Sequence, residues 1–160
     1  VHAFGGTMAN PDIGFKKLAA MTPSVAKFYS DMSEVVQLMA TGEIAIAIYV
    51  DGRFWAFVDQ NPWANFIVPE KGGTFQSSQI MKVKNSPADA WKLMNAFINA
   101  DAAKGFVAMI KYPVTNTKVV YPESMKNRVT NPKDILYPPF AEIAKNTPAL
   151  IERWNKEVGG

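Results

Sequence analysis

Seven consecutive apolar residues, from Ile44 to Val50, constrain the fold of this 160-residue chain more than any other feature. A strand with one face in water alternates apolar and polar residues, whereas a strand covered on both faces is apolar throughout. Isoleucine also occupies every second position at the start of this run. Residues 43–51 are therefore predicted to form a central strand of an α/β sheet, with other elements packed on both of its faces.

Helical spacing of apolar residues predicts helices on both sides of this strand. Asp31 is placed to cap one of them, with Glu34 three residues on, and Gly42 suits the left-handed position at its end. Pro87 is expected at the first position of another helix. The predicted helices cover residues 13–21, 32–41, 53–60, 87–100, 102–111, 140–146 and 148–158. Further extended segments are predicted at residues 24–30, 65–68 and 74–83.

Composition narrows the function classes. The chain is 48% hydrophobic and 19% charged, which is ordinary for a globular domain with a core. Its net charge is +3 with lysines scattered singly, so the clustered basic stripe of a nucleic-acid binder is missing. There is no cysteine, and the single histidine is His2 at the terminus, so no Ser-His-Asp or cysteine zinc site is predicted. No cofactor is predicted, and a ligand-binding module is favoured over an enzyme.

Charged residues follow the predicted central strand. Asp51 and Arg53 flank Gly52, and ligands of open α/β sheets bind beyond the carboxyl ends of strands. The alternative is a surface turn with a weak ion pair. A small enzyme that uses the carboxylates of Asp51 and Glu70 also stays open, because a fold alone does not fix a function.

The order of several motifs resembles the type II periplasmic solute-binding proteins of ATP-driven importers, nearest to the spermidine/putrescine-binding branch. Five segments carry the resemblance, and together they span roughly residues 22–158: LMATGEIAIAIYVDGR (38–53), FIVPEKGGTFQSSQIMKV (66–83), SPADAWKLMNAFINADAAKGFV (86–107), YPVTN (112–116) and IERWNKEV (151–158). The resemblance implies two α/β lobes joined by a hinge, with solute between them.

Within that fold, the chain would supply one lobe and a piece of the other. Residues 1–76 and 118–160 would form most of lobe two, and residues 77–117 would return to lobe one. The implied partners are a small-molecule solute, the membrane permease of an importer, and either the missing N-terminal lobe or a swapped copy of the chain; no nucleic acid is expected. The implied location is periplasmic or extracytoplasmic. A ligand-sensing effector domain of a regulator is the alternative, since regulators reuse this fold.

The resemblance also implies a set of ligand-binding residues. Where the polyamine branch carries an aromatic and an acidic residue, this chain has Gln76 and Ser78, which favour a neutral polar or anionic solute. Val50 likewise replaces a tryptophan of that branch. The loop before the capped helix and the edge beyond the central strand complete the expected cleft. The set is Ser30, Asp31, Tyr49, Asp51, Arg53, Phe75, Gln76, Ser77 and Ser78.

Overall fold

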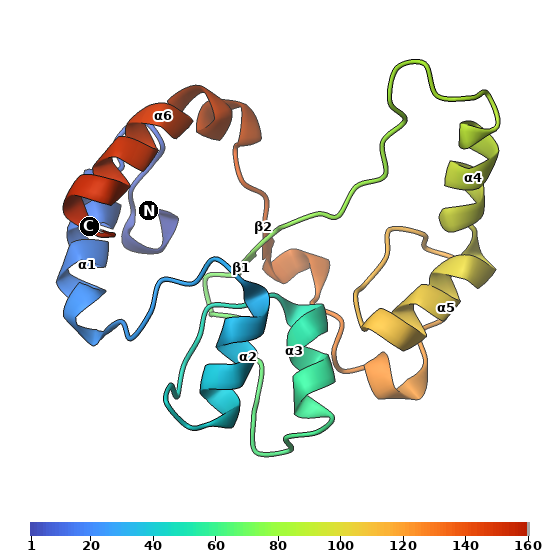
Figure 1. Cartoon of the computed structure of the whole chain (residues 1–160), viewed down its shortest axis with the longest axis horizontal. Coiled ribbons are helices and arrows are strands. Elements are labelled where there is room, and N and C mark those ends of the chain that lie inside the picture. Colours follow the sequence, from blue (N-terminus) through green and yellow to red (C-terminus); the bar gives the residue numbers. More distant parts are fainter. Residues whose placement is uncertain (160) are drawn as a thin grey trace. The chain divides into compact units, whose positions relative to one another are not determined.

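The computed structural model describes residues 1–159, and Gly160, the last residue of the expected 118–160 segment, lies outside the described part. The chain divides into two compact units, residues 1–45 with 136–160 and residues 46–135. The regular elements of each unit are mostly helices, and long irregular segments connect those of the second unit (Figure 1). The assignment of residues 1–76 and 118–160 to lobe two and of 77–117 to lobe one stays a prediction.

The first unit is held by a contact between its two longest helices. It contains η1 (His2–Phe4), α1 (Asp12–Met21), η2 (Thr22–Ser24), α2 (Met32–Ala40) and α6 (Phe140–Glu157). Helices α1 and α6 lie side by side (Figure 1). Arg153 of α6 donates to Asp12 at 2.7 Å and lies 4.3 Å from the centre of the Phe15 ring. Phe15 is buried, so the Arg153 guanidinium contacts both the apolar interface between α1 and α6 and an acidic side chain at its edge.

The second unit has a small core beneath α5. Its elements are α3 (Asp51–Val58), β1 (Gly73–Thr74), α4 (Ala90–Phe97), α5 (Ala100–Ile110), η3 (Glu123–Met125) and η4 (Pro132–Asp134). The core contains Ala103 and Val107 of α5 together with Val119 and Met125. β1 pairs with β2 (Ile135–Leu136) in a two-stranded sheet. The segment after α5 thus folds back to cover the apolar side of that helix.

An aromatic cluster and one arginine join α3 to the rest of the second unit. The ring centres of Phe54 and Phe57 are 5.7 Å apart, and the Trp55 ring packs against that of Phe66. The guanidinium of Arg128 lies 5.0 Å above the Trp55 ring and donates to Asp59 at 2.6 Å. The indole N–H of Trp55 donates in turn to the Arg128 carbonyl oxygen at 3.1 Å. These contacts connect residues about 70 positions apart in the chain.

The prediction of a central strand at residues 43–51 is wrong. No strand is assigned between Ile44 and Val50, and the side chains of Ile46 and Ile48 are 89% and 87% exposed. The predicted strands at 24–30 and 65–68 are also missing, and of residues 74–83 only Thr74 lies in a strand. A strand needs a neighbouring backbone for its hydrogen bonds, and the described residues contain only the short pair β1 and β2. An apolar run indicates that a segment suits a buried position, but it does not provide the neighbouring strand to which the segment must hydrogen-bond.

The predicted helices are confirmed, with three differences in detail. Asp31 caps α2 by accepting from the backbone N–H of Ser33 at 2.7 Å, but Glu34 pairs with Lys27 at 2.8 Å instead of closing a capping box. Helix α4 begins at Ala90, so Pro87 precedes it. The two predicted C-terminal helices are one, since α6 continues through a proline at position 148. Gly42 takes a φ of +76°, the left-handed conformation expected after α2.

Replacing Arg128 with alanine should weaken the second unit. The variant Arg128→Ala loses the contact with the Trp55 ring and the ion pair with Asp59, so we expect the free energy of unfolding to fall by about 1–2 kcal/mol at neutral pH. Arg128 also lowers the pKa of the Asp59 carboxyl through its hydrogen bond. The ion-pair part of the wild-type advantage should therefore be present above the ordinary carboxyl pKa and be lost as the pH falls through the lowered pKa of Asp59, whereas the contact with the Trp55 ring should remain.

Urea unfolding at neutral and acidic pH measures this difference. Lys126→Ala is the matched control, because Lys126 pairs with Glu123 only at the exposed surface. Its effect should stay below about 0.5 kcal/mol. Equal losses for the two variants would show that Arg128 is an ordinary surface charge.

Candidate functional site

The start of α3 brings together the predicted residues near the carboxyl end of the apolar run. Asp51 is the first residue of α3, and its Oδ1 accepts the backbone N–H of Gly52 at 2.7 Å. Burial raises the pKa of the Asp51 carboxyl, and this hydrogen bond opposes the rise. The Tyr49 ring lies 6.3 Å from that of Phe54, whereas Arg53 is exposed. A half-buried carboxyl therefore stands at a helix start, beside aromatic rings.

A tyrosine that the sequence did not single out also reaches this helix start. The ring of Tyr112 packs directly on Gly52, where a Cβ atom would lie 2.6 Å from ring atoms. Glycine is thus required for the close approach of this ring to the backbone of α3. No local pattern linked these two residues, because 60 positions separate them in the sequence.

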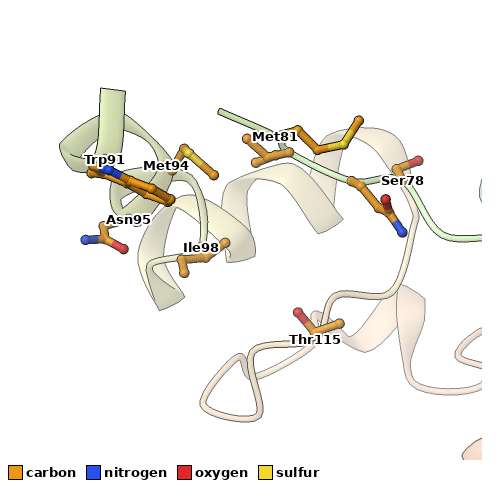
Figure 2. Close-up of a pocket in the computed structure, with 9 residues that line it drawn as sticks. Ser78, Met81, Trp91, Met94, Asn95, Ile98 and Thr115 are labelled. Atoms are coloured by element: carbon orange, nitrogen blue, oxygen red, sulfur yellow. The ribbon is translucent and has the colours of Figure 1, made fainter. Parts of the chain in front are cut away.

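A cavity of about 500 Å³ forms a second candidate site within the same unit (Figure 2). Four of the lining residues belong to α4 or directly follow it. The others come from the extended segment 78–81 and from the loop after α5. The lining residues are Ser78, Gln79, Ile80, Met81, Trp91, Met94, Asn95, Ile98 and Thr115. None of these residues carries a charge, so the cavity offers apolar surface with hydroxyl and amide groups.

Neighbouring polar contacts fix the walls of this cavity. The side-chain amide of Asn116 donates to the carbonyl oxygen of Ile98 at 2.7 Å, which holds the Thr115 loop beside the end of α4. The ammonium of Lys82 lies 5.9 Å from the centre of the Trp91 ring. In Figure 2, Trp91 stands at one end of the cavity and Ser78 at the other. The cavity therefore has an indole end and a hydroxyl end.

Of the nine predicted ligand-binding residues, the structure places only Ser78 in this cavity. Gln76 and Ser77 are exposed in the adjoining extended segment, where Ser77 Oγ accepts from the Gln79 amide at 3.1 Å, and Phe75 is half-buried. Ser30 and Asp31 belong to the first unit, and Asp31 serves there as the cap of α2. A single site that joins all nine stays a prediction.

Sequence reasoning missed the polar and aromatic residues that α4 contributes. Trp91 and Asn95 are four positions apart, a spacing that places both on one helix face. That spacing could have identified them as a pair, but nothing in the sequence indicated which element they would face. Thr115 was likewise found only as part of the YPVTN segment.

Residues 1–159 offer neither a metal-binding cluster nor a membrane-spanning helix. Within that range, no group of three or more histidine, cysteine, aspartate or glutamate residues is arranged to hold a metal ion. None of the helices in the same range combines the length and the apolar character needed to cross a bilayer.

Comparisons with known proteins identify relatives of the chain. The sequence profile of a family described as bacterial extracellular solute-binding protein matches residues 12–146. An extracellular solute-binding protein from Bordetella parapertussis is 29% identical, with a TM-score of 0.78 over 90% of this chain and 45% of that one. An ABC transporter protein from Clostridium perfringens ATCC 13124 is 20% identical, with a TM-score of 0.69 over 92% of this chain and 48% of that one. No curated protein matches the chain significantly.

These comparisons confirm the predicted class of fold and the preference for a binding protein over an enzyme. The family description and the Bordetella neighbour both name solute-binding proteins, and the second neighbour supports the fold alone. The chain spans less than half the length of each solved neighbour. The α/β class that the apolar run predicted is therefore right, although this chain does not form the strand itself.

The raised pKa of Asp51 leads to a pH-dependent prediction. Because burial disfavours the ionised carboxyl in the folded state, ionised Asp51 costs stability at neutral pH. This cost is absent below the unfolded-state pKa and grows as the pH rises through the raised pKa. Asp51→Asn keeps an oxygen for the Gly52 N–H, so it should raise the Tm at pH 7 and leave it unchanged near pH ~3.

Thermal unfolding by circular dichroism at the two pH values tests this expectation. Asp101→Asn is a suitable control, because exposed Asp101 lies in the first turn of α5 and favours the helix dipole. That control should lower the Tm slightly at pH 7. A lower Tm for Asp51→Asn at pH 7 would mean that the start of α3 stabilises the carboxylate more than burial penalises it.

Proposed function

Because the chain belongs to the family of bacterial extracellular solute-binding proteins, we propose that it forms part of the substrate-binding component of an ABC importer. The observation that carries this proposal is the family match over residues 12–146. The fold similarity to the Bordetella parapertussis protein supports it independently of the sequence profile. Such a component acts outside the cytoplasm and delivers its solute to a membrane permease.

The proposed mechanism is binding and closure, with no covalent step. Solute held between two lobes contacts both at once, so it binds the closed arrangement more tightly than the open one. The closed form then presents the solute to the permease. The two halves of such a site would lie on different lobes, and residues 1–160 span less than half of each solved neighbour.

The residues available on this chain favour a small solute with neutral hydrogen-bonding groups. Gln76, Ser77 and Ser78 offer an amide and two hydroxyl groups, and the cavity beside Ser78 adds Asn95 and Thr115. A polyamine needs carboxylates to pair with its ammonium groups, and the cavity lining contains none. The proposed opposite edge offers only Asp51, whose ionised form burial disfavours, and it also carries the cationic Arg53. We therefore propose a neutral polar or anionic solute rather than the polyamine that the nearest branch of the family implies. Tyr49, Asp51 and Arg53 are proposed to form the other edge of the cleft.

Native mass spectrometry of the polypeptide encoded by the whole reading frame would test the function. We expect a small molecule to co-purify with the protein and, after unfolding and refolding, to bind again in a calorimeter. Spermidine and putrescine, added as comparison probes, should bind at least tenfold more weakly. Tighter binding of spermidine would contradict the proposed solute class, and failure to bind any compound in a panel of sugars, organic anions, amino acids and polyamines would contradict the proposed function.

Ser78 provides the residue-level prediction. Ser78→Ala removes one hydroxyl from the hydroxyl end of the cavity, so solute binding should weaken by roughly three- to tenfold, the usual value of one neutral hydrogen bond. Ser124→Ala, an exposed serine of η3 outside the cavity lining, is the matched control and should leave the Kd unchanged. Equal Kd values for the wild type and both variants would remove Ser78 from the site.

A further inference from the structure

Helix α3 carries a glycine, Gly52, at a position where its backbone does not need one. A glycine within a helix costs stability relative to alanine, because its backbone loses more freedom on folding. Some glycines of the described residues adopt positive φ angles that favour this residue, but Gly52 is not one of them. The reason for a glycine at position 52 therefore lies in what packs on it.

The ring of Tyr112 occupies the space that a side chain at position 52 would need. A Cβ atom on Gly52 would lie 2.6 to 2.8 Å from the Cγ, Cδ1 and Cδ2 atoms of this ring. Contacts that short would force the ring or the helix to move. Gly52 is buried and Tyr112 is half-buried, so the ring covers the start of α3. The glycine and the tyrosine thus form a matched pair.

Neighbouring contacts hold Tyr112 in this place. The preceding residue, Lys111, ends α5 in a left-handed conformation with a φ of +66°, and packing must offset the cost of that conformation. Its ammonium lies 3.7 Å from the carboxylate of Asp59, at the opposite end of α3. Two residues after the tyrosine, the backbone N–H of Val114 donates to the Tyr121 hydroxyl at 3.1 Å. Consecutive residues after α5 therefore reach both ends of α3.

Gly52 lies between the two charged residues that the proposed cleft would use. Asp51 Oδ1 accepts the Gly52 N–H at 2.7 Å, so a shift of the backbone at position 52 would move the carboxyl with it. We infer that Tyr112 is a positioning residue, whose ring fixes the first turn of α3 and so sets where Asp51 and Arg53 stand at the edge of the proposed cleft. This inference deepens the proposed function and rests on it for the role of that edge.

The ionisation of Asp51 reports whether the ring positions it. Burial is the largest cause of the raised pKa of Asp51, and the backbone N–H groups of Asp51 and Gly52 oppose the rise. Tyr112→Ala lets water reach the start of α3, so the pKa of the Asp51 carboxyl should fall towards its ordinary value. Tyr112→Phe keeps the ring and should leave this pKa unchanged. NMR titration of the carboxyl carbon in the 160-residue chain measures the pKa in the folded state, which a general loss of stability would not move.

A cycle of substitutions at positions 52 and 112 tests the packing itself. Gly52→Ala should lower the Tm by about 3 °C or more, because its Cβ and the ring need the same space. In the Tyr112→Ala background the same substitution should raise the Tm by about 2–4 °C, since alanine is the better helix residue once the space is free. Gly105→Ala in α5 is the matched control, because its Cβ would have no other atom within 4 Å. The control should raise the Tm equally in both backgrounds.

Two results would overturn the inference. One is an Asp51 pKa that is the same in Tyr112→Ala as in the wild type. The other is a rise in Tm for Gly52→Ala in the wild-type background that matches the rise for Gly105→Ala. This second comparison needs no variant of Tyr112, so it decides the question even where Tyr112→Ala does not fold. Neither measurement needs a solute, so a failure to bind any compound would count against the proposed function and leave these results unaffected.

Discussion

The hydrogen-bonding need of the extended backbone is the constraint on which the rest of this structure depends. A helix satisfies its backbone groups within its own segment, whereas a strand needs a neighbour. The six α-helices of the described residues accordingly form within the chain, and the strands are limited to two residues each. The most apolar segment, Ile44 to Val50, remains outside any assigned strand although its composition suits the interior of a sheet.

Where the chain does pack, arginine and aromatic side chains make the connections. Arg153 bonds to Asp12 while it covers the ring of Phe15, and Arg128 does the same with Asp59 and Trp55. A planar guanidinium can stack on a ring and bond to a carboxylate at its edge at the same time. Each unit thus uses one arginine to join segments that are distant in the sequence. In a protein with a larger core, apolar contacts would make these connections.

The sequence predicted what is local and failed where a distant partner decides. Helix positions, the Asp31 cap and the left-handed Gly42 follow from side chains within a few residues, and all are confirmed. The strand at residues 43–51 depends on neighbours that no local pattern describes. The same distinction holds for the candidate site. Ser78 could be named from its motif, but Thr115 and Tyr112 enter through contacts between distant segments. Resemblance to a family filled part of this gap, because the order of motifs carries information about the whole fold.

The residues around the candidate cavity connect the fold to the proposed function. An importer's binding protein must hold two lobes together through a hinge and still let them move, so each lobe needs a core of its own and a polar cleft. Exposed apolar side chains such as Ile46 and Phe97 lie outside the lining of the candidate cavity, whereas exposed Met81 and Trp91 belong to it. In the proposed cleft, the neutral polar residues Gln76 to Ser78 would supply the hydrogen bonds to solute. Water can satisfy their hydroxyl and amide groups while the cleft is open, and a solute with matching groups can replace that water on closure. In the proposed mechanism, solute would set the balance between the two arrangements, because it contacts both lobes only in the closed one.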